Sequence, residues 1–261
     1  MFNILPMFKS HYSLGKSILT VEEPFDKKGK PVENSIFNIL IQNKLDTLVL
    51  VEDNVSGLLQ ASKVAKENKI KFVYGLRIWV ADDVSVKNEE FLKKRAKYVI
   101  FAKNSKAYKD LIKIWSFAAK DGFYYEPCID FKTLKKLWNP STLRLVVPFY
   151  DSYLFLNTIE SHIHVPQLDF TTPTYLVEEN SLPFDGYLAN KVKFVANEGN
   201  SPIMRAQSIF YKTEEDFIAY LAIRCLHNRT TIEKPELDHM GSSEFNFTKW
   251  KTINGEAGRV K

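Results

Sequence analysis

Residues 45–80 read LDTLVLVEDNVSGLLQASKVAKENKIKFVYGLRIWV, and the pattern of this stretch decides the fold class. Segment 45–51 is apolar and rich in branched side chains, and polar residues follow it at once, as is typical of a buried strand. In 57–68 the apolar residues recur at the three- and four-residue spacing of a helix. A further apolar run at 71–80 predicts a second strand. Strand, helix and strand with short connections form a βαβ unit, so we expect a parallel sheet.

The same alternation continues along the chain. The sequence predicts further strands at 98–102, 143–147 and 153–156, and further helices at 106–119 and 213–224. Because such β-α units recur in one uninterrupted chain, they favour an α/β barrel or an open, doubly wound sheet.

Three stretches depart from this rhythm. Residues 21–34 are charged and contain two prolines, which indicates an inserted loop. Residues 166–183 contain three prolines and few helix signals, and we interpret them as an irregular excursion. We assign residues 1–250 to a single domain and residues 251–261 to a polar tail, which is expected to fray.

Composition excludes several classes of protein. With 45% hydrophobic and 26% charged residues, the 261-residue chain has the make-up of an ordinary globular protein. Cys128 and Cys225 lie far apart, which argues against a disulfide scaffold and against a cysteine-based zinc site. There is no signal-peptide pattern and no apolar run of about 20 residues, so we expect a cytoplasmic protein without a membrane partner. The net charge of +5 fits an acidic partner such as DNA as well as it fits no charged partner at all.

Six short segments follow one another in an informative order: SHYSL at 10–14, NVSG at 54–57, GLRIWV at 75–80, AKNSKAYKDLIK at 102–113, DGFYYEPCID at 121–130 and SEFNF at 243–247. Together they resemble the polymerase-and-histidinol-phosphatase (PHP) domain at the N-terminus of bacterial DNA polymerase III α subunits. The resemblance extends over nearly the whole chain. It implies a distorted, TIM-like α/β barrel of seven β-α units and a link to DNA replication.

The resemblance also implies where a metal site would lie. An active PHP site gathers imidazoles and carboxylates at strand ends, because such ligands suit its metal ions. In this sequence the positions that match those ligands carry Met7, Lys9, Val51, Glu52, Arg77, Lys97, Ser208 and Phe210. Protonated lysine and arginine cannot ligate a metal, and phenylalanine and valine offer no ligand atom.

We therefore predict a degenerate pocket with no metal, no cofactor and no catalytic residue. Its remaining carboxylate, Glu52, could form an internal salt bridge with Arg77 or Lys9. The alternative is that the same positive charges bind an anion or a phosphate group.

Two other features suggest different chemistry. His162 and His164 would share one face of a strand and could form a metal pair near Glu160, although a surface loop is the simpler interpretation. The aromatic segment 122–125 could stack on bases, and the lysine-rich stretches could contact phosphates, but packed or solvated surfaces are the simpler interpretation.

The sequence thus favours a non-catalytic PHP-like domain that serves as a structural or docking module in DNA replication. Its partners would be a polymerase core or a proofreading exonuclease, and we expect no activity from the chain alone because the catalytic palm would follow Lys261. One alternative is a metal-dependent phosphoesterase with a rearranged site at His162 and His164. Another is a non-specific nucleic-acid-binding protein, although we expect its DNA binding to be weak.

Overall fold

The computed structural model describes residues 3–233 and 241–257. The chain divides into two compact units. The first comprises residues 1–74, 178–185 and 205–261, and the second comprises residues 75–177 and 186–204. Strands β3 (Lys71–Ala81) and β8 (Ile203–Ile209) each run from one unit into the other.

The first unit is built around strand β1, which is buried on both sides. Strand β1 (Leu5–Phe8) pairs in parallel with β2 (Thr47–Glu52), where Phe8 lies opposite Leu50. It also pairs in parallel with β8, from Leu5 opposite Ala206 to Phe8 opposite Ile209. The helices of this unit are α1 (Ile36–Gln42), α2 (Leu58–Glu67), α8 (Phe217–Asn228) and α9 (Phe247–Ala257), with the short 3-10 helix η1 (Glu214–Asp216) before α8.

The second unit is built around strand β4 (Arg95–Ala102), which runs antiparallel to both of its neighbours, β3 and β6 (Leu143–Val147). Strand β5 (Cys128–Asp130) pairs in parallel with β3, and β7 (Thr174–Val177) pairs in parallel with β6. The helices are α3 (Glu89–Lys93), α4 (Ala107–Lys120), α5 (Phe131–Leu137), α6 (Tyr153–Ile159) and nearly all of α7 (Asp185–Glu198).

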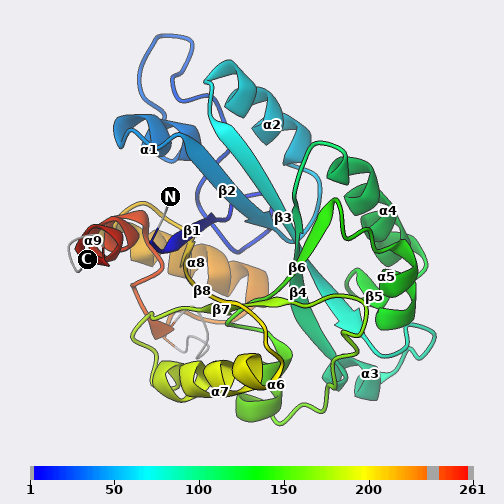
Figure 1. The fold of residues 1–261 in the computed structure, drawn as a ribbon. Coiled ribbons are helices and arrows are strands. Elements are labelled where there is room, and N and C mark those ends of the chain that lie inside the picture. Colours follow the sequence, from blue (N-terminus) through cyan, green and yellow to red (C-terminus); the bar gives the residue numbers. More distant parts are fainter. Residues whose placement is uncertain (1–2, 234–240, 258–261) are drawn as a thin grey trace. The chain divides into compact units, whose positions relative to one another are not determined.

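The order of strand pairing confirms the predicted fold class. The strands pair in the order β2-β1-β8-β7-β6-β4-β3-β5, and β2 pairs in addition with β3 (Figure 1). Seven strands therefore follow one another in a closed order, with β5 added beside β3. This is the α/β, TIM-like barrel order that the resemblance implies. The sheet is mixed rather than purely parallel, because β4 is antiparallel to both of its neighbours.

The predicted strand at 153–156 is wrong, because these residues form helix α6. Ser152 caps the helix, and its Oγ accepts a hydrogen bond from the backbone N–H of Phe155 at 3.3 Å. All four side chains of 153–156 are buried, so the short apolar run has no polar face from which a helical period could be recognised.

Two further predictions need correction. The excursion at 166–183 contains strand β7, whose residues Thr174–Val177 pair with β6. The first part of the predicted polar tail at 251–261 is helical, because helix α9 continues to Ala257. The last four residues of that predicted tail lie outside the described part of the chain.

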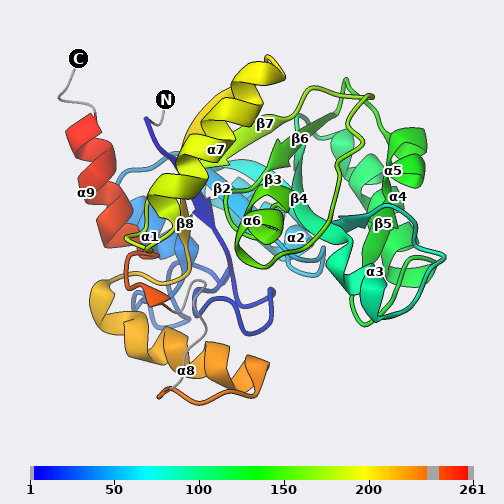
Figure 2. The same cartoon turned by 90° about the horizontal axis from the view of Figure 1, so that it is seen from below.

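Helix α9 is attached to β1 within the first unit (Figure 2). The indole Nε1–H of Trp250 donates to the carbonyl oxygen of Ile4 at 2.9 Å. The side-chain oxygen of Asn254 accepts from the backbone N–H groups of Asn3 and Ile4, at 3.2 and 3.1 Å. A buried indole donor with a backbone acceptor holds a helix firmly, because leaving either group unpaired would cost about 1–3 kcal/mol.

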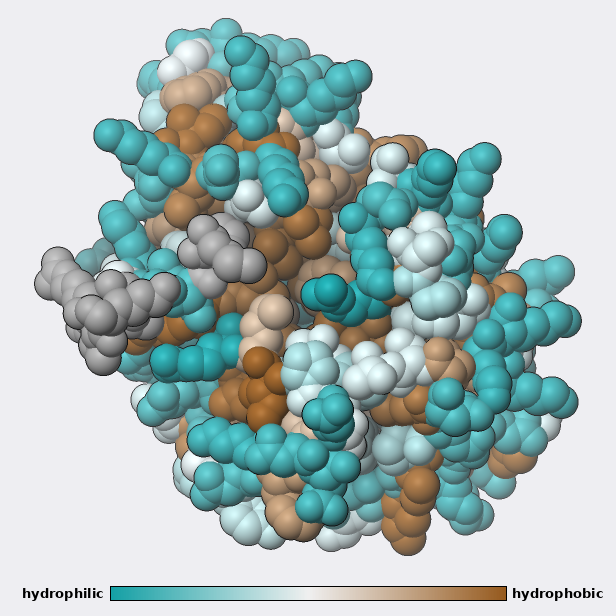
Figure 3. Space-filling view, viewed as in Figure 1, coloured by the Kyte–Doolittle hydropathy of each residue, from teal (hydrophilic) through white to brown (hydrophobic). Residues whose placement is uncertain are grey.

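Hydrophilic side chains cover most of the face shown in Figure 3, with hydrophobic side chains exposed between them, as on an ordinary protein surface. Among the described residues, the helices are too short or too polar for any of them to cross a lipid bilayer.

Candidate functional site

The loop after β1 surrounds the carboxylate of Glu52, which stands at the end of β2 and is fully buried. The backbone N–H of Ser10 donates to one carboxylate oxygen of Glu52 at 2.8 Å. The hydroxyl of Ser13 donates to the other oxygen, and itself accepts from the backbone N–H of Asp53 at 2.9 Å. Both oxygens of Glu52 are thus bonded to the segment 10–14, and the serine hydroxyl at its fourth position supplies one of these bonds.

Lys9 pairs with the aspartate that follows Glu52 in the chain. The Nζ of Lys9 lies 3.0 Å from an oxygen of Asp53, and the Nζ of Lys16 lies 3.3 Å from the same oxygen. Lys9 is buried, whereas Lys16 is partly exposed. The sequence suggested that Glu52 could pair with Arg77 or Lys9, and in the structure Asp53 is at ion-pair distance from Lys9. Lys9 still acts on Glu52 through its charge.

Burial controls the protonation of this group. Removal from water raises the pKa of Glu52 above its ordinary value of 4.5, against the opposing effects of Lys9 and of the two serine hydrogen bonds. Burial also raises the pKa of Tyr74 well above 10.0, and the charges of Glu52 and Asp53 raise it further. The Tyr74 hydroxyl donates to the backbone oxygen of Asn54 and therefore remains a phenol.

Ser208 is bonded to a carboxylate that sequence reasoning missed. Its backbone N–H and its hydroxyl donate to the two oxygens of Glu178, at 2.7 and 2.9 Å, and Glu178 is buried. Glu178 directly follows β7 in the sequence TYLVEE. A short apolar run followed directly by a carboxylate was the sequence signal that could have identified Glu178 as a residue at the end of a strand. It went unrecognised because 166–183 was interpreted as an irregular excursion.

Phe210 belongs to an aromatic stack in the core of the first unit. Its ring centroid lies 5.3 Å from that of Phe245 and 5.6 Å from that of Tyr220, with nearly parallel planes. Met7 and Val51 are buried as well. At these three positions the side chains contribute apolar packing, and their neighbours are core residues.

In the second unit, Arg77 pairs with Asp151. An Nη of the guanidinium lies 2.6 Å from the carboxylate of Asp151 and donates to the backbone oxygen of Tyr150 at 3.1 Å. Arg77 is buried, and Asp151 has a left-handed backbone with φ 57°. Asparagine and aspartate are the non-glycine residues that adopt this conformation most readily. The backbone at this turn therefore accommodates Asp151, whose carboxylate pairs with Arg77.

Lys97 and Arg95 both contact the ring of Trp79. The Nζ of Lys97 lies 4.4 Å from the ring centroid, and the guanidinium carbon of Arg95 lies 4.3 Å from it. Lys97 is directly opposite Trp79 in the ladder between β3 and β4. Arg95 also pairs with Glu126 at 2.9 Å. Such cation–π contacts contribute about 0.5–2 kcal/mol each and hold positive charge over the ring face.

The two histidines of the alternative metal pair have separate environments. His164 is fully buried: its Nδ1–H donates to the carbonyl of Lys94 at 3.0 Å, and its Nε2 faces the Tyr98 hydroxyl at 3.1 Å. His162 lies 3.5 Å from the carboxylate of Glu160. Burial lowers the pKa of both imidazoles below 6.5. Both ring nitrogens of His164 are thus engaged in hydrogen bonds with other protein groups.

These geometries can be compared with known proteins. Residues 8–152, more than half of the chain, match the family described as the PHP domain. The chain belongs to the PHP domain family.

Several relatives of this PHP chain are DNA polymerase III α subunits. The subunit of Aquifex aeolicus (strain VF5) is 23% identical over 194 residues, which cover 69% of this chain and 17% of the relative. That of Treponema pallidum (strain Nichols) is 23% identical over 201 residues, 74% of this chain and 17% of the relative. That of Borreliella burgdorferi is 36% identical over 90 residues, 32% of this chain and 7% of the relative. The PHP chain therefore spans less than a fifth of the length of these relatives.

At the positions that the resemblance matches to PHP ligands, the lysine and arginine side chains do not suit a divalent metal ion. Lysine and arginine are donors only, and the serine hydroxyl at position 208 is engaged with Glu178. Within residues 3–233 and 241–257, histidine, cysteine, aspartate and glutamate side chains form no group of three or more that could hold a metal. Burial raises the pKa of the Cys128 thiol to about 12, so this cysteine is a packed apolar side chain rather than a ligand.

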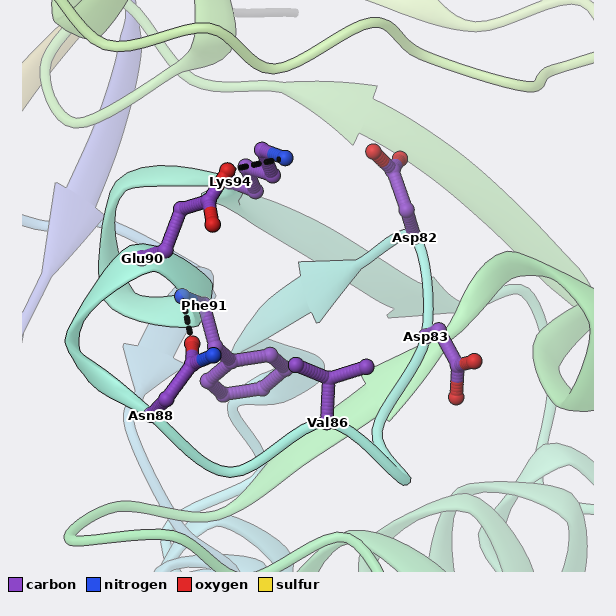
Figure 4. A pocket seen from close by; sticks show the side chains of 7 residues that line it. All are labelled: Asp82, Asp83, Val86, Asn88, Glu90, Phe91 and Lys94. Carbon is purple, nitrogen blue, oxygen red and sulfur yellow. Dashed lines mark hydrogen bonds and ion pairs between the residues drawn. The ribbon is translucent and has the colours of Figure 1, made fainter.

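A small pocket lies elsewhere in the second unit, at the turn between β3 and α3 (Figure 4). Its volume is about 210 Å³, and Asp82, Asp83, Val86, Asn88, Glu90, Phe91 and Lys94 line it. Lys94 pairs with Glu90 at 2.6 Å, and Asn88 caps α3 by accepting from the N–H of Phe91 at 2.9 Å. Small-molecule sites generally have about 300–1,000 Å³, so this pocket is too small to suggest one.

Proposed function

We propose that this PHP-family chain is a non-catalytic domain that acts as a structural or docking module in DNA replication. One observation carries the proposal. At three positions that match metal ligands of the family, the chain has the cations Lys9, Arg77 and Lys97, all of them buried.

Electrostatics supports the non-catalytic part of the proposal. A divalent ion about 4 Å from a single ammonium or guanidinium group is opposed by roughly 8 kcal/mol at an effective dielectric constant of about 20. The carboxylates that could offset this repulsion have protein partners: Asp53 pairs with Lys9, and Asp151 pairs with Arg77. A hydrolytic PHP mechanism needs a water molecule that is activated by a metal ion. At the positions matched to metal ligands, this chain instead has lysine and arginine side chains, and Lys9 and Arg77 form ion pairs with aspartates.

The relatives support the replication part. Their names identify a replicative polymerase subunit, and this chain matches only a small fraction of each. A domain without catalytic groups contributes to such an assembly by packing or by docking a partner. The proposed partners are the polymerase core or a proofreading exonuclease, both by analogy with the family.

Metal content and phosphatase activity test the non-catalytic part. The full chain is purified without chelators, its zinc, manganese and iron are quantified, and hydrolysis of a generic phosphomonoester is measured with each metal added. We expect sub-stoichiometric metal and no activity above buffer. Stoichiometric metal together with activity that disappears in His164→Ala would establish the rearranged phosphoesterase instead.

Association with replication proteins tests the docking part. The full chain is immobilised and presented with the purified polymerase core and the proofreading exonuclease of its own host. We expect retention of at least one of them at physiological salt. Retention of neither would count against the replication role, and DNA affinity that falls steeply with salt would favour a nucleic-acid-binding protein.

A further inference from the structure

Helix α4 in the second unit carries a row of lysines on its outer side (Figure 1). We call this row the α4 lysine stripe, and it consists of Lys106 at the N-cap followed by Lys109, Lys113 and Lys120 within the helix. All four side chains are exposed. With 3.6 residues per turn, they fall within about 60° of the helix circumference. The stripe lies outside the positions matched to PHP ligands, and its role is independent of the proposed function.

The charge of the α4 lysine stripe is not neutralised by ion pairs. On other helices of the chain, lysines have acidic partners. Lys63 pairs with Glu67 on α2 at 3.9 Å, and Lys94 pairs with Glu90 at the end of α3 at 2.6 Å. Within the part of the chain that the structure describes, no carboxylate lies at ion-pair distance from a lysine of the stripe. The stripe is therefore a local excess of positive charge.

Two acidic residues are close to the stripe in sequence, and they reduce its charge only at one end. The carboxylate of Asp110 accepts hydrogen bonds from the amide of Asn139 at 3.2 Å and from the hydroxyl of Thr142 at 2.6 Å, which direct it toward the residues before β6. Asp121, the C-cap of α4, directly follows Lys120 and offsets part of the charge there. The uncompensated charge is therefore concentrated on the first three lysines.

The stability of the helix does not account for the lysines at its start. Lys106 occupies the N-cap, where its side chain makes no capping hydrogen bond, and Lys109 stands in the first turn. The N-terminus is the positive end of the helix dipole, so a cation is disfavoured there by up to about 1 kcal/mol. Serine, threonine, aspartate or asparagine would cap the helix better. Positive charge at a place where folding disfavours it indicates an anionic partner.

The chemistry of the stripe favours phosphate groups over a protein surface. Lysine is depleted in interfaces between proteins, whereas lysine and arginine make many of the contacts to DNA phosphates. The exposed aromatic residue of α4, Tyr108, points about 100° or more away from each lysine around the helix. The stripe therefore offers no ring on which the bases of a single strand could stack.

We propose that the α4 lysine stripe is a contact surface for the sugar-phosphate backbone of duplex DNA, independent of base sequence. From Lys106 to Lys120 the stripe is about 21 Å long. A duplex carries one negative charge per about 1.7 Å of its axis, so a duplex along α4 presents about 12 phosphates over that length. Each lysine therefore has a phosphate within reach. Such contacts position a protein on DNA without reading its sequence.

The number of lysines sets the expected affinity and its dependence on salt. With three to four phosphates contacted, the slope of log K against log salt concentration should be about −3. Proteins that make about six to ten phosphate contacts have much steeper slopes, so this surface is weaker than that of a self-sufficient nucleic-acid-binding protein. We expect a dissociation constant on the order of 10 µM at about 20 mM salt, which weakens about 100-fold by about 100 mM.

Fluorescence anisotropy tests the proposal. A labelled duplex of about 20 base pairs and mixed sequence is titrated with the full chain at about 20–100 mM KCl. The triple variant Lys106→Gln/Lys109→Gln/Lys113→Gln should weaken binding by about 10-fold or more at the lowest salt and reduce the slope to about −1 or shallower, because each lost phosphate contact removes about 1 from it. Wild-type binding that is undetectable at about 20 mM salt overturns the proposal.

A second triple variant separates the stripe from the net charge of the chain. Lys27→Gln/Lys28→Gln/Lys30→Gln removes the same charge from exposed positions of the inserted loop in the first unit. This variant should bind like the wild type, with an unchanged slope. Circular dichroism verifies that both triple variants are folded. Equal losses of affinity in the two variants would show that net charge, and not the stripe, attracts the DNA.

Two further probes distinguish duplex DNA from other polyanions. A single strand of the same sequence should bind more weakly than the duplex, because its charge density is lower and the stripe has no stacking platform. Polyglutamate of matched total charge should also bind more weakly, since an extended peptide carries one charge per about 3.3 Å. Tighter binding of the single strand would indicate base stacking, and equal binding of polyglutamate would indicate an acidic protein partner. Either result contradicts the proposal.

Discussion

At the scale of single residues, the buried cations at the positions that the resemblance matches to PHP ligands each have an environment of their own. Lys9 pairs with Asp53, Arg77 pairs with Asp151, and Lys97 lies over an aromatic ring. Such groups are costly to bury and become more costly when a partner is removed, because the remaining charge is then uncompensated. The stability of the chain should therefore depend on the partners at least as strongly as on the cations themselves.

Asp151→Asn should lower the free energy of unfolding by about 1–3 kcal/mol, because it removes the carboxylate beside a buried guanidinium. Asparagine tolerates the left-handed backbone at this position, so the substitution tests charge and not strain. Urea denaturation followed by fluorescence gives the value. Asp169→Asn is the control, since its ion pair with Lys135 is exposed and should be worth less than about 0.5 kcal/mol. Equal effects of the two substitutions would argue against a buried pair.

His164 should make stability fall as the pH falls below 6.5. Burial lowers the pKa of the His164 imidazole in the folded chain. Below pH 6.5 the unfolded chain therefore binds more protons at this imidazole than the folded chain does, and acid favours unfolding. Protonation of Nε2 would also remove the acceptor that faces the Tyr98 hydroxyl. The unfolding free energy measured between about pH 5 and pH 8 should rise with pH and level off above the unfolded pKa. His164→Gln should flatten the acidic part of that curve, and an unchanged slope would exclude His164 as its source.

The residues at the expected ligand positions can be named from sequence, because most of these positions lie in or shortly before the segments that carry the resemblance. The partners of the replacing residues could not be predicted in the same way. Asp151 and Glu178 meet Arg77 and Ser208 across long sequence separations, and only the pairing of strands brings them together. The hydrogen bonds from residues 10 and 13 to the two oxygens of Glu52 were likewise not predicted, because the loop after β1 gives no pattern that shows where its donors point.

At the scale of elements, the predictions succeeded where periodicity was clear and failed where burial removed it. The βαβ unit at 45–80 corresponds to β2, α2 and β3. Helix α6 was predicted as a strand, since a short run that is buried on all sides has the same composition in either structure. Strand β7 has four residues and is preceded by a proline-containing stretch, so its signal was too short to outweigh the turn residues.

Gly122 is required by the close approach of α4 and β5. A Cβ at this position would lie 1.9 Å from the carbonyl oxygen of Cys128, and backbone at that distance cannot yield without moving the strand. Gly122→Ala should therefore lower the free energy of unfolding by about 2–4 kcal/mol. Gly186→Ala, at an open position of α7, should be neutral or stabilising by up to about 0.5 kcal/mol. Urea denaturation of both variants measures the two effects. Similar midpoints would contradict a close contact between Gly122 and the backbone of Cys128.

At the scale of the whole molecule, the chain passes between the two units four times, and two of these passages occur within strands. Strands β3 and β8 each supply residues to both units, so at two places a single strand is divided between them. Neither unit corresponds to one continuous stretch of sequence. For this reason the sequence supported a single domain of residues 1–250 and gave no indication of a division.

Unfolding should accordingly occur in one transition. Trp250 belongs to the first unit, whereas Trp79, Trp115 and Trp138 belong to the second. Trp250→Phe leaves fluorescence that reports only on the second unit, and replacement of the other three by Phe leaves fluorescence from the first. In each variant the fluorescence and far-UV circular dichroism curves in urea should superimpose. Separate midpoints within one variant would show that the units unfold independently.

The stack of Phe210 between Phe245 and Tyr220 has an evolutionary consequence. A histidine at position 210 would exchange apolar packing for a polar ring inside the core, and substitutions of that kind cost about 1–3 kcal/mol. No metal would repay this cost until the other ligands were also in place. A change to histidine at this position alone would therefore lower stability before any metal could bind. The aromatic packing around Phe210 thus makes position 210 resistant to exchange for a metal-binding residue.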